Sequence, residues 1–297
     1  MKYYAEEYIS DAYHSILYDL KNNPEFIASP RNMEVKEIRD CTIKVNKPMV
    51  NLFNNEFRSS PIKYISAELF WYFSGTNKSK FIENYASLWS KIKNPDNETV
   101  NSAYGHLIFS NKNEHGLTQY QWVIDSLKKD KESRQAFMHF NTPEHQWFGN
   151  KDQVCTLQAL FHIRDNKLHM TLTMRSNDVI LGFMTDWAFF SVLQYHVYLH
   201  LKEYYPELKM GSYTHISHSM HLYAKHYDLV EKMLTTDFFP ESLPLLNETI
   251  LEENGSIKSK YNEVFDPILK YSEIDKYKIT DNSLLNYCYD KLKPIDN

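Results

Sequence analysis

The residues that could carry chemistry lie in the middle of the chain. Cys155 lies 20 residues ahead of Arg175, which opens the run Arg175–Phe183, and Asp186 follows that run. A thiol can add to a ring carbon, and an arginine with a hydroxyl can hold a phosphate. A carboxyl group can form hydrogen bonds with the edge of a base. This combination of residue types suits chemistry on a pyrimidine nucleotide.

Each of these residues also has an interpretation without function. Free cysteines are usually buried, so Cys155 could be a core thiol. An active thiol needs a cationic neighbour, and Arg175 could be that neighbour only if the two strands that carry these residues pair. Arg175 and Ser176 could instead cap the end of a strand. Asp186 could be only the N-cap of the helix that follows it.

Four other polar residues have similar alternatives. Glu68 lies within the apolar run Ile65–Trp71, where it either faces solvent from a helix or moves protons at a cavity wall. His221 and Tyr223 alternate along an extended segment, so both could point at one ligand, or both could be core residues with satisfied hydrogen bonds. Arg134 would ordinarily be a solvated surface charge.

Bulk composition excludes several classes of protein. The chain has 297 residues, 42% hydrophobic and 15% aromatic, which indicates a globular protein with a substantial core,. Its formal net charge of -5 gives no sign of a nucleic-acid-binding surface,. Glycine occurs only 7 times, and neither a GxxxxGK[ST] nor a GxGxxG motif is present.

Cysteine usage and hydropathy indicate the compartment. The three cysteines lack CxxC or CxxH spacing, so neither a disulfide framework nor a zinc site is expected. The N-terminus is acidic and polar, unlike a signal peptide. The most apolar stretch, Trp187–Leu201, is too short and too polar to span a bilayer,. We therefore expect a cytoplasmic protein.

The spacing of apolar residues predicts both helices and strands. Helices are expected over residues 3–21, 62–73, 78–92, 118–130, 186–204, 224–234 and 281–292,. Strands are expected over residues 34–56, 137–140, 156–164, 168–175 and 213–223,. Loops are expected at 95–97, 104–105, 141–153 and most of 236–275. With no repeat and no linker, the pattern predicts one α+β domain over residues 1–297.

Together the motifs resemble the thymidylate synthase superfamily, in family order over roughly residues 31–235. The matching stretches are Glu68–Trp71, Asn101–Gly105, Ser133–Arg134, Cys155, Arg175–Val179, Leu181–Gly182 and His221–Tyr223. The resemblance implies an α+β fold with a mixed β-sheet flanked by helices, and a homodimer formed through the sheets. Residues 236–297 have no recognisable counterpart and are expected to be a loop-rich extension.

The resemblance also implies roles for individual residues. The cysteine of that family adds to C6 of the pyrimidine, which assigns the nucleophile to Cys155. The other implied catalytic residues are Glu68, Tyr104 and Asp186. Substrate contacts fall to Arg175, Ser176, Asn177, His221, Tyr223 and an Arg134 lent across the dimer interface. Contacts with 5,10-methylenetetrahydrofolate fall to Asp178, Trp89 and Gly182, and no metal is implied.

Several positions depart from the pattern of the synthases. Asp186 stands where most synthases have Asn, Thr156 where they have His, and Met174 where they have Gln. These three departures resemble the deoxycytidylate hydroxymethylases of T-even-type phages. Arg134 is followed by glutamine instead of a second arginine, and Arg31 is a candidate for the N-terminal phosphate loop.

The type of residue at position 186 bears on the choice of base. Uracil offers an acceptor at O4 and a donor at N3, which an amide complements. Cytosine offers a donor at N4, from which a carboxyl group can accept. A carboxylate that faces O4 of uracil opposes two acceptors, at a cost of roughly 1–3 kcal/mol. Asp186 therefore favours cytosine.

These observations predict an enzyme that hydroxymethylates dCMP at C5 with methylenetetrahydrofolate. The alternatives on the same scaffold are a thymidylate synthase that methylates dUMP, or a methylase or hydroxymethylase of dCMP or CMP. An inactive homologue that only binds a nucleotide is an alternative from a different class. No nucleic-acid or membrane partner is expected.

Overall fold

The computed structural model describes residues 1–269 and 280–292. The chain forms two compact units, each assembled from three segments. The first unit comprises residues 1–61, 155–195 and 209–243, and the second comprises 62–154, 196–208 and 244–297. The expected single domain over residues 1–297 stays a prediction.

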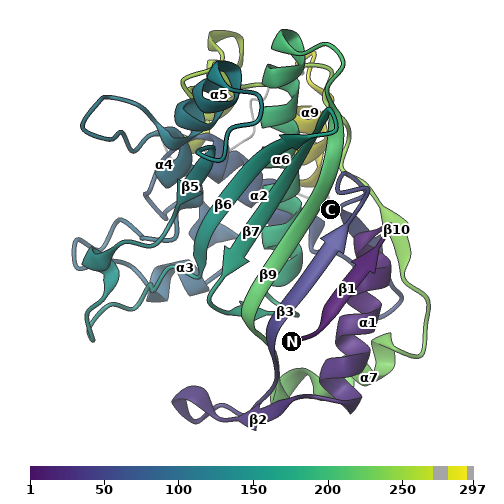
Figure 1. The fold of residues 1–297 in the computed structure, drawn as a ribbon. Helices are drawn as coiled ribbons and strands as arrows, with labels where there is room; N and C mark the ends of the chain where they lie inside the picture. The colour runs from purple at the N-terminus through teal and green to yellow at the C-terminus, as the bar shows by residue number, and fades with distance from the viewer. Residues whose placement is uncertain (270–279, 293–297) are drawn as a thin grey trace. The chain divides into compact units, whose positions relative to one another are not determined.

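A mixed β-sheet forms the centre of the first unit (Figure 1). Its neighbouring strands are, in order, β1 (Tyr3–Glu6), β3 (Val35–Val45), β9 (Lys209–Tyr223), β7 (Lys167–Met174) and β6 (Thr156–Arg164). The β1–β3 and β7–β9 pairs are parallel, whereas β3–β9 and β6–β7 are antiparallel. Two short strands extend it, because β2 (Phe26–Ala28) pairs with β3 and β8 (Asn177–Asp178) pairs with β9. The expected mixed sheet is confirmed.

The β6–β7 hairpin follows from its sequence. Asp165 and Asn166 form its two-residue turn with φ values of 50° and 55°, a left-handed conformation that Asp and Asn tolerate better than most residues. Beyond the turn, Leu168, Met170 and Leu172 are buried, as the alternation predicted. The hairpin brings the residue before β6 next to the residue after β7.

Two helices and part of a third complete the first unit's core. Helix α1 (Ile9–Asn22) packs on β1 and β3, and α7 (Tyr227–Met233) packs on α1. The expected helix over residues 3–21 is wrong at its start, because Tyr3–Glu6 pairs with β3 as a strand. Helix α6 (Phe183–Tyr204) begins in this unit. No helix in the described residues is long and apolar enough to cross a membrane.

The second unit is mainly helical. Its elements are α2 (Ile62–Phe73), η2 (Ile82–Asn84), α3 (Leu88–Lys91), α4 (Tyr104–Phe109), α5 (Gln119–Lys129), β5 (Phe137–His139) and η3 (Pro143–His145). The expected helix over residues 78–92 is wrong, because only the short η2 and α3 form there. Tyr104 and Gly105 begin a helix and do not lie in a loop.

Gly105 permits close packing of α4 on α2. A Cβ atom at this position would lie 1.8 Å from the carbonyl oxygen of Tyr72. Any side chain would therefore force the two helices apart. This steric requirement gives a physical reason for glycine after Tyr104.

The C-terminal part contains more helix than its sequence suggested. Strand β10 (Phe239–Glu241) pairs with β4 (Leu52–Asn54) in the first unit. The second unit gains η5 (Ser259–Tyr261), α8 (Asn262–Leu269) and α9 (Ser283–Leu292), the last as expected. Residues 270–275 of the expected loop lie outside the described residues.

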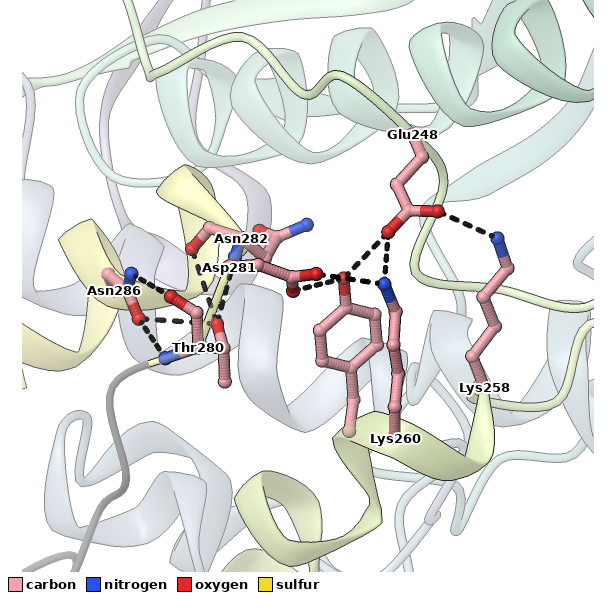
Figure 2. A network of polar contacts seen from close by, with 8 residues as sticks. Glu248, Lys258, Lys260, Thr280, Asp281, Asn282 and Asn286 are labelled. Carbon is pink, nitrogen blue, oxygen red and sulfur yellow. Dashed lines mark hydrogen bonds and ion pairs between the residues drawn. The ribbon is translucent and has the colours of Figure 1, made fainter.

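A network of ion pairs joins the C-terminal elements (Figure 2). Lys260 contacts both Glu248 and Asp281, the latter at 3.1 Å, and Lys258 lies 3.5 Å from Glu248. The Tyr261 hydroxyl lies 3.3 and 3.1 Å from the same two carboxylates and can donate its single hydrogen to either one. The network, defined as these five residues, links segments that the sequence separates.

Candidate active site

Cys155 meets the condition set for an activated thiol. It directly precedes β6, and its carbonyl oxygen accepts a hydrogen bond of 2.9 Å from the Arg175 backbone amide. The Arg175 guanidinium Nη2 lies 3.4 Å from the Cys155 Sγ. A cation at this distance favours the thiolate over the thiol.

The other two cysteines are in a different environment. Cys41 and Cys288 are buried in the core, whereas Cys155 is partly exposed. Burial raises the pKa of each core thiol to about 12. The interpretation of Cys155 as a core thiol is therefore wrong, while the same interpretation suits Cys41 and Cys288.

The segment after β7 is held by backbone pairing. In β8, Asn177 and Asp178 pair in parallel with Met220 and His221 of β9. The Asp178 Oδ1 accepts from the amides of Ile180 and of the next residue, at 2.8 and 3.1 Å. Ser176, just ahead of this strand, is partly exposed. The turn that connects β8 to α6 is thus fixed from both ends.

Asp186 is not the N-cap of its helix. Helix α6 begins at Phe183, and the Asp186 amide already donates to the Gly182 carbonyl, at 2.9 Å. The side chain therefore does not have the capping role that its sequence position suggested. Its Oδ2 instead accepts a 2.7 Å hydrogen bond from the Asn177 Nδ2.

The Asp186 carboxyl has an unusual electrostatic environment. Although part of the residue is accessible to solvent, the surrounding protein shields the carboxyl and raises its pKa to about 7, against a smaller lowering by the Asn177 hydrogen bond,. Gly182 lies directly beside it, because a Cβ there would be 3.4 Å from Oδ2, close to ordinary van der Waals contact. Around neutral pH this carboxyl can be either an acceptor or a donor.

His221 and Tyr223 are neighbours on β9, as expected. Their rings lie 5.1 Å apart and nearly perpendicular, at 88°. The Arg31 Nη2 lies 3.4 Å from the Tyr223 hydroxyl, and Arg31 has a left-handed backbone with φ of 53°. The structure therefore brings the weakly indicated Arg31 to a residue that the family resemblance had assigned to the sugar.

Glu68 is buried in α2 of the second unit, so the solvent-facing alternative is wrong. Its Oε1 accepts from the Tyr64 hydroxyl at 2.8 Å and from the Tyr72 hydroxyl at 3.4 Å. The buried Trp89 indole donates to the same Tyr64 hydroxyl, at 3.0 Å. Trp89, Tyr64 and Glu68 thus form one hydrogen-bonded chain. The Trp89 indole is only a donor in it, and the Tyr64 hydroxyl is the group beside the carboxyl that could exchange a proton with it.

The other predicted residues of the second unit lie on separate elements. Tyr104 is buried at the start of α4, with its ring 5.5 Å from that of Tyr72. Arg134 is exposed between α5 and β5. No group of three or more His, Cys, Asp or Glu residues that could hold a metal ion occurs in the described part of the chain.

A family model for thymidylate synthase matches residues 38–292. The chain belongs to the thymidylate synthase family. The match continues past residue 235, where the recognisable motifs end, and so includes most of the C-terminal part of the chain. Thymidylate synthase family members are transferases, and the family uses methylenetetrahydrofolate as a co-substrate.

Similar proteins include several phage enzymes. The chain is 30% identical over 217 residues to the deoxycytidylate 5-hydroxymethyltransferase of Enterobacteria phage T4, covering 70% of this chain and 83% of that one. It is 25% identical over 256 residues to the deoxyuridylate hydroxymethyltransferase of Bacillus phage SP01, covering 80% and 65%. The thymidylate synthase of Buchnera aphidicola (strain APS) is 29% identical over 204 residues, covering 66% and 71%.

Two polar residues of this thymidylate synthase family chain escaped the sequence analysis. Asp152 is buried three residues before Cys155, and its Oδ2 accepts from the Ser102 amide at 2.7 Å. Tyr64 joins Glu68 to Trp89. The signals available for them were an acidic residue just ahead of Cys155 and a tyrosine one helical turn from Glu68.

Proposed function

We propose that this member of the thymidylate synthase family is a deoxycytidylate 5-hydroxymethyltransferase. It would convert dCMP, 5,10-methylenetetrahydrofolate and water into 5-hydroxymethyl-dCMP and tetrahydrofolate. Such a product suits a phage that modifies its cytosines. The proposal rests on one observation above all, the carboxyl of Asp186 at the position where most synthases carry an amide.

The proposed reaction begins at Cys155. Its thiolate forms a bond from Sγ to C6, and the electron pair of the C5–C6 double bond attacks the one-carbon unit of the folate. Loss of the C5 proton and of tetrahydrofolate leaves a methylene group on C5. Water adds to that methylene, and expulsion of the thiolate restores the ring. Glu68, in its chain with Tyr64, is the residue to which we assign proton transfer.

The choice of cytosine follows from the chemistry of Asp186. An ionised carboxyl accepts from the N4 amino group of cytosine and repels O4 of uracil. Its pKa of about 7 means that the ionised form is substantially present at neutral pH. Asp186 is partly accessible to solvent, which contact with a base requires.

Binding roles are proposed for the remaining residues. Arg175 and Ser176 would hold the 5′-phosphate, with Arg134 of the partner subunit in a homodimer, and Asn177 would contribute beside them. His221 and Tyr223 would contact the sugar. Arg31 supports this assignment, because it is exposed and its guanidinium lies 3.4 Å from the Tyr223 hydroxyl. The pterin of the folate would contact Asp178, Trp89 and Gly182.

The test is to incubate purified protein with dCMP or dUMP and methylenetetrahydrofolate, and to weigh the nucleotide products. A gain of one CH2O unit on dCMP is expected. A gain of CH2 with formation of dihydrofolate would instead establish methylation. A product from dUMP but not from dCMP would overturn the assignment of cytosine.

Hydroxymethylation of dUMP is the second candidate. It is favoured by the similarity to the Bacillus phage enzyme and by the neutral form of Asp186, which can donate to O4 of uracil. The same incubation separates the two substrates. An inactive nucleotide-binding homologue is disfavoured by the accessible thiol with its guanidinium neighbour.

A further inference from the structure

Asn177 is the polar partner of the Asp186 carboxyl. Asn177 is 3% exposed, and its Nδ2 donates to Oδ2 of Asp186 at 2.7 Å. The Asn177 Oδ1 is buried without a hydrogen-bond partner among the described residues. The cost of that unsatisfied acceptor indicates that the amide is retained for what its donor does.

A single donor makes the two carboxyl oxygens unequal. An N–H group directed at Oδ2 fixes that oxygen as an acceptor in both protonation states. When the carboxyl is neutral, its proton is therefore placed on Oδ1. Oδ1 then changes from an acceptor in the ionised form to a donor in the neutral form, while Oδ2 does not change.

From this geometry we infer that Asn177 is a positioning residue for base selection. It keeps Oδ1 of Asp186 as the atom that contacts the pyrimidine base, and it thereby makes selectivity for cytosine depend on pH. The inference rests on the proposed function. With Oδ1 ionised, the site accepts from the amino group of cytosine and excludes uracil. With Oδ1 protonated, it can donate to N3 of cytosine or to O4 of uracil, and selectivity is lost.

The titratable side chains of β9 that pack near Asp186 do not change charge near pH 7. Phe183 and Trp187, its neighbours on α6, contact His215 and Tyr213 of β9. Burial lowers the pKa of His215 to about 3 and raises that of Tyr213 well above its usual value. Both are neutral near pH 7. On β8 the partner is the uncharged Asn177, while the Asp178 carboxyl accepts from the amides of Ile180 and Leu181. The pKa of Asp186, about 7, then sets the pH at which selectivity changes.

The decisive experiment measures equilibrium binding of dCMP and dUMP by calorimetry from pH 6 to 9, without folate. For the native chain we expect the dCMP preference to rise by about tenfold through neutral pH. Asn177→Ala removes the donor that lowers the pKa of Asp186, so the rise should move to higher pH and the preference at pH 7.5 should fall by about tenfold. An unchanged midpoint and preference in this variant would overturn the inference.

Controls separate this inference from the proposed function. Asn51 is also buried and also bonds to α6, with its Nδ2 3.0 Å from the Ser191 Oγ. Asn51→Ala should reduce stability without moving the pH dependence of selectivity, whereas an equal shift would refute a specific role for Asn177. In an Asp186→Asn background, Asn177→Ala should lose its effect on the pH profile. If the native chain shows no preference for dCMP at any pH, the proposed function itself is contradicted, whatever the result for Asn177→Ala.

Asn177→Ser provides a second route if the alanine variant does not fold. Its shorter side chain cannot span the distance to Oδ2, so it should reproduce the shift. In either variant, the ¹³C resonance of the Asp186 carboxyl, assigned by its absence from Asp186→Asn, reports the titration directly. A midpoint equal to that of the native chain would contradict the inference even if affinity changed.

Discussion

Carboxyl groups have opposite electrostatic environments in the Asn177–Asp186 pair and in the ion-pair network around Lys260. In the network, Glu248 and Asp281 each contact a lysine ammonium and lie within hydrogen-bond distance of the Tyr261 hydroxyl (Figure 2). Their pKa values are lowered, chiefly by the hydrogen bond from Lys260. Asp186 has one neutral amide as its hydrogen-bond partner, and its pKa is raised.

The difference separates an arrangement that favours stability from one that opposes it. Opposite charges hold the network in its ionised form at every physiological pH, where it can add modest stability. A shielded carboxyl without a cation makes folding less favourable whenever it ionises, so stability alone gives no reason to retain it. The comparison predicts that changes near Asp186 alter chemistry, and that changes in the network alter only stability.

The comparison is tested most strongly by removing the thiol. Cys155→Ala should reduce turnover by at least ~10⁴-fold, because no other group can form the bond to C6. Cys155 is partly exposed, so the melting temperature should change little. Product formation is measured by mass spectrometry. Iodoacetamide labelling of the native chain at Cys155, but not at Cys41 or Cys288, is the internal control, and turnover by the alanine variant would exclude covalent catalysis.

Asp186→Asn should separate selectivity from stability. The ratio of kcat/KM for dCMP to that for dUMP is expected to fall roughly 10–100-fold, from a hydrogen bond worth about 1–3 kcal/mol. Because folding raises the pKa of Asp186, the stability linked to its protonation is lost as pH rises through about 7,. The variant should therefore melt at a higher temperature than the native chain at pH 8. A lower melting temperature there would show that the carboxyl serves stability.

Acid should destabilise the second unit through buried histidines. Burial lowers the pKa of His196 to about 3 and that of His200 to about 4, so their contribution to stability is present above the unfolded value of about 6.5 and lost as pH falls below it. His196→Gln should flatten the fall in melting temperature between pH 7 and 5. His139→Gln, at an exposed histidine, is the control and should leave that slope unchanged.

The smallest effect is expected in the network. Lys260→Met removes the cation shared by Glu248 and Asp281 and should lower the melting temperature by about 2 °C, less at high salt. Turnover of dCMP and its selectivity over dUMP should stay as in the native chain. A change of selectivity in this variant would contradict the distinction drawn between the two regions.

Local patterns explain which elements could be predicted. The apolar run of α2, between Pro61 and a Gly75 with φ of 70°, gave both ends of that helix correctly. The β6–β7 hairpin was predicted from its alternation and its Asp-Asn turn. Strand β1 was missed because its conformation is decided by pairing with residues 42–45, a contact that no local pattern reveals.

The candidate site divides in the same way. The residue types and their order identified Cys155 and Arg175, and hairpin pairing made their contact foreseeable. The hydrogen bond from Asn177 to Asp186 joins residues nine positions apart, and its geometry depends on where α6 begins. The prediction that Asp186 caps the helix placed the start of α6 three residues too late. It therefore did not show that the carboxyl can bond to another partner.

The placement of Asp186 inside the first turn of α6 also bears on evolution. A helix already stabilised by its own backbone does not depend on this side chain for its start, so exchanging aspartate and asparagine leaves the main chain where it is. The codons for these two amino acids differ by one nucleotide. Under the proposed role of Asp186, enzymes with opposite pyrimidine preferences are adjacent in sequence space, and a lineage can cross between them without passing through a misfolded ancestor.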